Sequence, residues 1–155
     1  MRTKIALFAF LALATVGCGR PFEPATPSGF VDMGDRYADD EYRAATADGV
    51  VLGIRAFDND PKGELAFWAK ALENRMRTRG GYALLDRRDV KSKSGADGVQ
   101  LRFGHDQEGE PYLYWVTLFV TDDRIFLLEA GGPKEEITRE EARIEWSIAN
   151  FEHAR

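Results

Sequence analysis

Residues 114–132 read "YWVTLFVTDDRIFLLEAGG", and they predict the centre of a β-sheet. Two apolar runs flank the acidic pair Asp122-Asp123, which is a plausible short turn. The first run, extended back to Tyr112, is apolar at successive positions, a pattern typical of a strand that is covered on both faces. The stretch therefore predicts two neighbouring strands, 112–121 and 124–130, with the first at the centre of a sheet.

The sequence predicts further strands before this pair. Residues 82–90 and 98–104 read as strands, and the second alternates cleanly between apolar and polar positions. Residues 41–57 read as two strands around Asp48-Gly49, because this dipeptide supplies the positive φ angles of a two-residue hairpin loop. In the second strand of that hairpin one face carries Val50, Leu52, Ile54 and Ala56, and the other carries Val51, Gly53, Arg55 and Phe57.

Two helices complete the pattern. The first is expected to begin at Asp60 as N-cap with Pro61 at the first helical position, and to stop at Gly80. The second is expected to begin at Thr138, because Thr138 and Glu141 have the spacing of a capping box. The predicted class is α+β, with a mostly antiparallel sheet of about six strands, helices packed on it, and the order β-β-α-β-β-β-β-α.

Over residues 37–152 this order resembles the PsbP-like α/β-sandwich superfamily, which includes bacterial lipoproteins of the DcrB type. The likeness rests on the element order, on the stretch 114–132 and on a last helix that closes with "SIANF" at 147–151. Members include photosystem assembly factors, partner-binding proteins and lipoproteins. The resemblance implies a fold, and no functional motif comes with it.

The first eighteen residues carry an independent pattern. Arg2 and Lys4 precede the uncharged apolar run 5–16, which is too short to cross a bilayer core of about 30 Å and has the length of a signal-peptide core. Small residues follow and lead to Cys18, the one cysteine of the chain. This stretch resembles a bacterial lipoprotein signal, with Thr15 standing where leucine is usual.

That resemblance implies cleavage before Cys18, a diacylglycerol on its sulfur, and an acyl chain such as palmitate on its amino group. Gly19 in place of Asp after the cysteine implies the outer membrane, on the periplasmic side. An ordinary secretory signal that is cleaved elsewhere is the alternative. The expected organisation is a signal peptide at 1–17, the lipidated cysteine with a Pro-rich tether at 18–35, and one α/β domain at 36–155.

The tether has two interpretations. Pro21, Pro24 and Pro27 favour an extended, semi-rigid spacer that holds the domain away from the membrane. Alternatively, Phe22 and Phe30 dock onto the domain, and the two interpretations can each hold in part.

The net charge of the chain limits the class of partner that the folded domain can bind. The chain has 21 basic and 26 acidic residues, a net charge of −5, and loss of Arg2 and Lys4 with the signal peptide leaves 19 against 26, or −7. A nucleic-acid partner needs a basic surface, so this balance argues against one. It also argues against broad adhesion of the folded domain to anionic lipid, which leaves the N-terminal lipid as the membrane contact.

The sequence offers no catalytic motif. It has neither a phosphate-binding G-x-x-x-x-G-K loop nor a G-x-S-x-G elbow. The one arrangement that an enzyme could use is His105 with Asp86 or Asp89, and no nucleophile is placed with it. One cysteine and two histidines are too few for a structural zinc site, and the acidic loop 58–64 lacks the later ligands of a calcium loop. We therefore predict no catalytic residue, no metal and no cofactor.

Two aromatic residues stand away from the apolar stripes of the helices. At about 100° per residue, Phe67 falls about 160° from the stripe of the first helix, and Trp146 falls opposite the stripe of the second. They are either covered on a second buried side, covered by the folded-back tether, or part of a surface for a protein partner. Cover from within the chain is the preferred interpretation, and a partner surface is the functional one.

The sequence therefore favours a lipid-anchored, non-catalytic envelope protein that binds a protein partner or supports an envelope complex. The alternative is a small-molecule or lipid-binding module, with Tyr112, Tyr114 and Trp115 lining a pocket.

Overall fold

The computed structural model describes residues 19–34 and 41–154. The main strands are β3 (Glu41–Ala45), β4 (Val51–Asp58), β5 (Ala83–Lys91), β6 (Asp97–Gln107), β7 (Glu110–Val120) and β8 (Arg124–Pro133). Three strands have only two residues each: β1 (Phe22–Glu23), β2 (Val31–Asp32) and β9 (Glu152–His153). The helices are α1 (Leu65–Arg79) and α2 (Lys134–Ala149).

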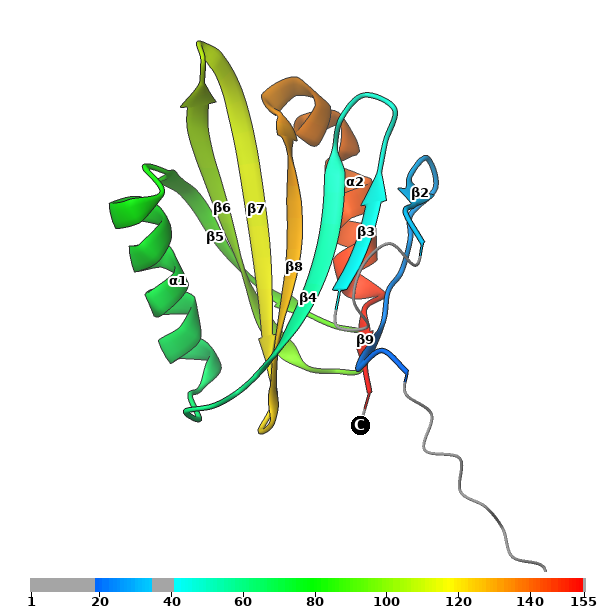
Figure 1. The fold of residues 1–155 in the computed structure, drawn as a ribbon, viewed down its shortest axis with the longest axis vertical. Coiled ribbons are helices and arrows are strands. Elements are labelled where there is room, and N and C mark those ends of the chain that lie inside the picture. The colour runs from blue at the N-terminus through cyan, green and yellow to red at the C-terminus, as the bar shows by residue number, and fades with distance from the viewer. Residues whose placement is uncertain (1–18, 35–40, 155) are drawn as a thin grey trace, which may run out of the picture.

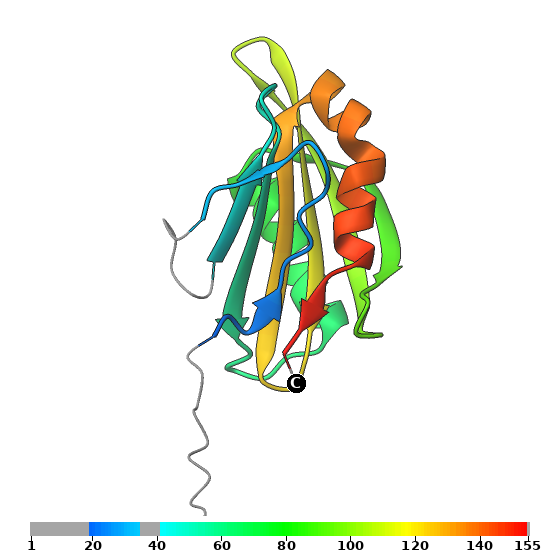
Figure 2. The same ribbon diagram turned by 90° about the vertical axis from the view of Figure 1, so that its right-hand side faces the viewer.

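A seven-stranded antiparallel sheet forms the middle layer, in the order β2-β3-β4-β8-β7-β6-β5. Helix α1 lies on one face of the sheet, and α2 lies on the opposite face together with the N-terminal segment (Figures 1 and 2). The expected α+β class and the predicted order of elements between residues 41 and 149 are confirmed. The sheet has one strand more than the predicted six, because β2 is too short to leave a periodic signal.

The stretch 114–132 takes the central position expected of it. Strand β7 lies between β6 and β8, and β8 lies between β7 and β4. The turn at Asp122-Asp123 is closed by Thr121, whose N–H donates to the Arg124 carbonyl at 2.8 Å and whose hydroxyl accepts from the Arg124 N–H at 3.0 Å. Side chains of β7 are buried on both faces of the sheet, as the continuous apolar pattern predicted.

The alternation of the strands builds a separate core on each face. On the α2 side, Trp115 and Phe119 of β7 pack with Ile144 and Phe151. On the α1 side, Val116 and Leu118 of the same strand pack with Leu101, Phe103 and Ala69, among others. Because both cores draw on β7, this strand joins the two halves of the sandwich.

The N-terminal segment packs on the domain. Phe22 is 1% exposed, and its strand β1 pairs with β9 next to the C-terminus. Phe30 is buried as well, and the Thr26 and Tyr42 hydroxyls lie 2.6 Å apart. Of the two interpretations of the Pro-rich stretch, docking through Phe22 and Phe30 holds for residues 22–32. Residues 1–18, with the predicted signal peptide and Cys18, and residues 35–40 lie outside the described residues.

The motif "SIANF" at 147–151 contacts the N-terminal segment and holds it against the domain. The Ser147 hydroxyl donates to the Ala25 carbonyl at 2.7 Å. The ring of Phe151 is fully buried and touches the rings of Phe22, Phe119 and Phe126 at centroid distances of 5.4 to 6.2 Å. The last residues of the chain thus complete the core and also hold the first described ones.

Both helix starts differ from the predictions. Helix α1 begins at Leu65 and not at Asp60, because Asn59 organises the preceding loop: its side chain bonds both the N–H and the carbonyl of Gly63 and accepts from the Trp68 ring. Helix α2 begins one turn before the predicted capping box. There the Thr138 hydroxyl donates to the Lys134 carbonyl within the helix, at 2.7 Å, and does not act as a cap.

Candidate functional site

The α1 face of the sheet is only half covered. Helix α1 packs on β5, β6 and β7, whereas β3, β4 and β8 on this side have no helix over them. Figure 1 shows the difference: α1 stands beside the sheet, and the strands between β8 and β3 are open toward the viewer. This asymmetry leaves a groove between the helix and the open strands.

We call this hollow the α1 groove, and it has a volume of about 620 Å³. It is lined by Arg55, Phe57, Asp58, Trp68, Ala71, Leu72, Arg75, Met76, Tyr114, Leu118, Ile125 and Leu127. A second hollow of about 180 Å³ continues along the open strands and shares Arg55 and Tyr114 with it. The volume falls in the range of ligand-binding clefts, and the lining is mostly apolar with a few polar groups.

A polar cluster marks the point where the two hollows meet. Arg55 donates from Nε and Nη2 to the two carboxylate oxygens of Glu129, at 2.8 and 2.7 Å, and the Tyr114 hydroxyl also donates to Glu129. The hydrogen bonds to Glu129 raise the pKa of Arg55. Burial raises the pKa of Tyr114, and the charge of Glu129 adds to that rise. Tyr114 therefore stays a protonated donor at neutral pH, and the cluster is rigid and satisfied from within.

Arg75 is the one groove cation that this cluster does not involve. It lies on the exposed side of α1 and has no hydrogen bond or ion pair with any described residue. By contrast, Lys70 and Arg77 on the same helix both pair with the buried Glu73. A partner that fills the groove therefore meets an apolar floor with one available positive charge at the rim.

The three residues predicted to line one pocket do not come together. Tyr114 lines the α1 groove, but Trp115 points to the α2 side, because successive residues of a strand face opposite ways. Tyr112 shares a face with Tyr114 but lies near the end of the strand, where its ring centroid is 6.0 Å from that of His105. Only Tyr114 of the three belongs to a hollow of ligand size.

Trp115 borders a much smaller internal cavity of about 20 Å³. Gln100 Nε2 and Thr117 Oγ1 are buried there without a hydrogen-bond partner. A cavity of this volume has room for about one water molecule, which would satisfy both groups. It is too small for an organic ligand.

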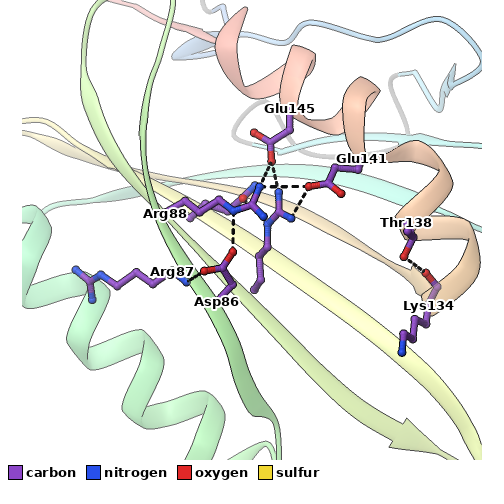
Figure 3. Close-up of polar contacts among 9 residues, drawn as sticks. Asp86, Arg87, Arg88, Lys134, Thr138, Glu141 and Glu145 are labelled. Carbon is purple, nitrogen blue, oxygen red and sulfur yellow. Dashed lines mark hydrogen bonds and ion pairs between the residues drawn. The ribbon is translucent and has the colours of Figure 1, made fainter.

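A charge cluster holds α2 to the sheet on the side opposite the groove. Arg102 of β6 is 5% exposed and stacks on Trp115, with 3.8 Å between its guanidinium carbon and the ring centroid. Its guanidinium bonds Glu141, at 2.6 Å, and Glu145 of α2. Figure 3 shows these two carboxylates pointing from α2 toward the sheet, where Arg88 also reaches Glu141 and bonds Asp86. The cluster fixes the helix, and its groups are already satisfied.

Phe67 and Trp146 are exposed, at 60% and 49%. The preferred expectation that the chain itself covers them is wrong: Phe67 has an edge contact only with the neighbouring Trp68 ring, and the docked segment leaves Trp146 open. They lie on helices on opposite faces of the sheet, so they do not form one continuous patch.

The residues of the enzyme alternative are also separated. His105 Nδ1 lies 3.1 Å from the Asp106 carbonyl, and its ring packs near Tyr82. Asp86 instead bonds Arg88, and the register pairs Asp86 and Asp89 with Arg102 and Val99. In the part of the chain that the structure describes, no group of three His, Cys, Asp or Glu side chains is arranged to hold a metal ion.

Sequence reasoning missed the groove itself. The alternation in 50–57 places Arg55 and Phe57 on one face of their strand, but it does not indicate that α1 leaves that face open. Nor did it show Glu129 as the partner of Arg55, since these residues are 74 positions apart. Across residues 19–34 and 41–154, no helix is long and apolar enough to cross a bilayer.

Comparison with known proteins identifies chains of the same fold. No protein-family model and no curated protein sequence matches this chain. Among solved structures, LpqN of Mycobacterium tuberculosis, described as involved in cell envelope biogenesis, is similar with a TM-score of 0.63 and 12% identity, over 91% of this chain and 88% of LpqN.

Two further structures support the same architecture. Cyanobacterial PsbP (CyanoP) from Synechocystis is similar with a TM-score of 0.54 and 10% identity, covering 86% of each chain. A protein of unknown function, PA94 from Pseudomonas aeruginosa, has a TM-score of 0.53 and 16% identity over 70% of this chain and 79% of its own. At such identities the likeness shows the fold alone, and it confirms the PsbP-like α/β sandwich.

Proposed function

We propose that this chain is a lipid-anchored envelope protein that binds a protein partner along the α1 groove. The observation that carries the proposal is the uncovered half of the sheet, where β3, β4 and β8 face outward beside α1. A cleft of this volume that is lined mostly by apolar side chains, with a few polar groups, has the character of a binding site. Phe57 and Val51 are exposed on this open face, and aromatic anchors of this kind are enriched in protein interfaces.

The cell-envelope part of the proposal has two supports. One is the lipoprotein-like signal that ends in Cys18. The other is the shared fold with LpqN, which is itself described as acting in envelope biogenesis. We further propose the outer membrane, facing the periplasm, because Gly19 and not Asp follows the cysteine.

We propose a role in binding and not in catalysis. Three polar groups where the two hollows meet, Arg55, Glu129 and Tyr114, bond one another, so none of these three is poised to exchange a proton with a substrate. His105 bonds the neighbouring main chain. These features favour a scaffold that recognises a surface.

Replacing Cys18 with serine tests the anchor. The Cys18→Ser protein cannot accept a thioether-linked diacylglycerol, so we expect it to leave the membrane fraction and appear in the soluble envelope extract. The matched control is Ser28→Ala, an exposed change beyond the docked β1 strand, which should stay with the membrane. Retention of the Cys18→Ser protein in the membrane fraction contradicts a lipid anchor at this residue.

Site-specific photocrosslinking tests the groove. A photoreactive amino acid at Val51 or at Arg75 places the probe on either side of the groove, and Val31 on the far edge strand gives an exposed control. In intact cells we expect one discrete protein adduct from both groove positions and none from Val31. Adducts of equal yield at all three positions, or none at the groove, contradict a partner at this site.

The volume of the groove also supports a second candidate function, the binding of a small molecule. About 620 Å³ also suits a small amphiphilic molecule, with Tyr114 in the wall and Arg75 at the rim. Native mass spectrometry of the purified protein distinguishes the two functions. A bound small molecule that is lost in a Leu72→Arg variant favours the ligand-binding function, and an empty protein that crosslinks at the groove favours the partner.

A further inference from the structure

The uncovered part of the sheet on the α1 face is about as wide as one helix. Strands β8, β4 and β3 lie side by side there, and no helix packs over them (Figure 1). Neighbouring strands are about 4.8 Å apart, so three of them form a strip about 14 Å wide, and a helix with its side chains is about 10 Å across. Because packed helices lie about 8 to 10 Å apart, a second helix on this strip would also touch α1.

The main chain of the uncovered strands leaves no place for an added strand. Strand β4 pairs with β3 on one side and β8 on the other, and β8 pairs with β4 and β7. The outer edge of β3 is taken in part by β2. A partner on this face therefore has to bind through side chains, and an amphipathic helix presents such side chains along one of its sides.

The walls of the α1 groove offer apolar surface to such a helix. On α1, the side chains of Trp68, Leu72 and Met76 line the groove and are only partly buried. Ala71 lines the same wall and is small, so a neighbouring helix can approach α1 closely. Across the groove, Phe57 of β4 is 43% exposed. A helix with an apolar stripe would cover both walls at once.

Two arginines on this flank of α1 have no partner. Arg75 lines the groove, and Arg79 follows one turn later on the same flank, just beyond the lining. Both are exposed, and neither side chain has a hydrogen bond or ion pair with any described residue. Two carboxylates one turn apart on a neighbouring helix would complement this pair.

The unpaired charge changes sign along α1. Arg55 and Asp58, the other charged residues of the groove lining, are each held in an ion pair of their own. At the N-terminal end of α1, Glu64 and Asp122 are exposed and have no ion pair with a described residue. The carboxylates of the partner are therefore expected beside the C-terminal half of α1, and they would be repelled from its other end.

A second copy of this chain is a poorer match for the two arginines. Among the described residues, Glu73 of α1 and four glutamates of α2 already bond cations of their own molecule. In the two described helices, Glu135 is the one glutamate without such a bond. A single free carboxylate cannot complement both Arg75 and Arg79, which favours a different protein in the groove.

We infer that the α1 groove binds an amphipathic helix of another protein, with its apolar stripe on the sheet and two carboxylates, one turn apart, against Arg75 and Arg79. The inference rests on the proposed function, because it names the kind of partner that the groove takes. Helix α1 has 15 residues. A helix of similar length, about 22 Å, spans the groove and completes the layer that α1 begins over the sheet.

Two designed peptides test the chemistry of this partner. Each has about 18 residues, enough for a helix of about 27 Å, with the same leucine stripe and a glutamine outer side. They differ at two positions one turn apart beside the stripe, with glutamate in one peptide and lysine in the other. By fluorescence anisotropy we expect the purified full chain to bind the glutamate peptide about tenfold more tightly. Circular dichroism should show that this peptide gains helix on binding. Equal affinities, binding of neither peptide, or binding without a gain of helix overturns the inference.

Reversing the charge of the two arginines gives the complementary test. The double variant Arg75→Glu with Arg79→Glu should prefer the lysine peptide, because attraction and repulsion exchange places. The matched control is Arg87→Glu with Lys134→Glu, which changes the net charge equally at two exposed cations outside the groove. This control should keep the preference of the wild type. A groove variant that still prefers the glutamate peptide contradicts the role given to the arginines.

Photocrosslinking in intact cells separates this inference from the proposed function. With the probe at Val51, absence of any protein adduct counts against partner binding itself. Support for the helix is an adduct whose yield falls several-fold in the charge-reversed variant and whose linked segment has apolar residues at helical spacing with two carboxylates one turn apart. An adduct between two copies of this chain, or a linked segment without that pattern, overturns the helix and leaves binding at the groove in place.

Discussion

Replacing Glu141 and Glu145 together with glutamine is expected to lower the free energy of unfolding by about 3 kcal/mol. The two carboxylates neutralise Arg102, whose guanidinium is buried against Trp115 under α2. Glutamine keeps the size and one acceptor but removes both charges. Arg102 then remains buried without a counter-charge, which is more costly than losing an exposed ion pair. Urea denaturation followed by circular dichroism measures the change.

Glu141 and Asp86 give the protein an acid-sensitive component. The hydrogen bond from Arg102 lowers the pKa of Glu141, and the hydrogen bond from Arg88 lowers that of Asp86. A carboxyl group whose pKa is depressed by folding contributes stability above its unfolded pKa and loses it as the pH falls through the folded value. We therefore expect the wild type to lose more stability than the double variant on acidification below the usual glutamate range.

A matched control is available on the same helix. Glu135 and Glu136 lie in the first turn of α2, away from Arg102, and their double replacement with glutamine removes the same number of charges. This control should cost less than about 1 kcal/mol, through the helix dipole and the loss of the exposed Glu136–Arg139 pair. Equal losses in the two double variants contradict the buried-charge explanation.

The central strands could be predicted because their signal is local. In 112–121 apolar residues occupy both faces over most of the strand, and the next run, 124–130, repeats the pattern over a shorter length. Helical periodicity is also a local signal. It predicted that Phe67 and Trp146 lie away from the apolar stripes of their helices, and both side chains do face away from the core. Whether something covers them depends on the path of the N-terminal segment, and no local pattern records that path.

The groove could not be predicted from any local pattern, because its residues come from segments that are far apart in the sequence. The groove exists because α1 packs on β5, β6 and β7 and leaves β4 and β8 uncovered on that face. The position of the helix on the sheet depends on tertiary packing. Alternation could already have separated Trp115 from Tyr114, since neighbouring residues of a strand face opposite ways. The start of α1 was missed because the loop is organised by Asn59, whose partner Thr121 is 62 positions away.

Replacing Phe22 with alanine is expected to cost about 3 kcal/mol of stability, as is typical of deleting a buried aromatic ring. The ring lies 6.3 Å from that of Phe126 and 6.2 Å from that of Phe151, and nothing else from the N-terminal segment fills this space. The neighbouring Glu23 is exposed on the same strand, so Glu23→Ala is the matched control and should change stability by less than about 0.5 kcal/mol.

The loss in Phe22→Ala should begin as local detachment, because β1 has only two residues and its pairing with β9 is its one strand contact. Limited proteolysis between residues 22 and 30 should therefore accelerate well before the sheet unfolds, and it should not accelerate in Glu23→Ala. Uniform protection of this stretch in Phe22→Ala contradicts the role given to the ring.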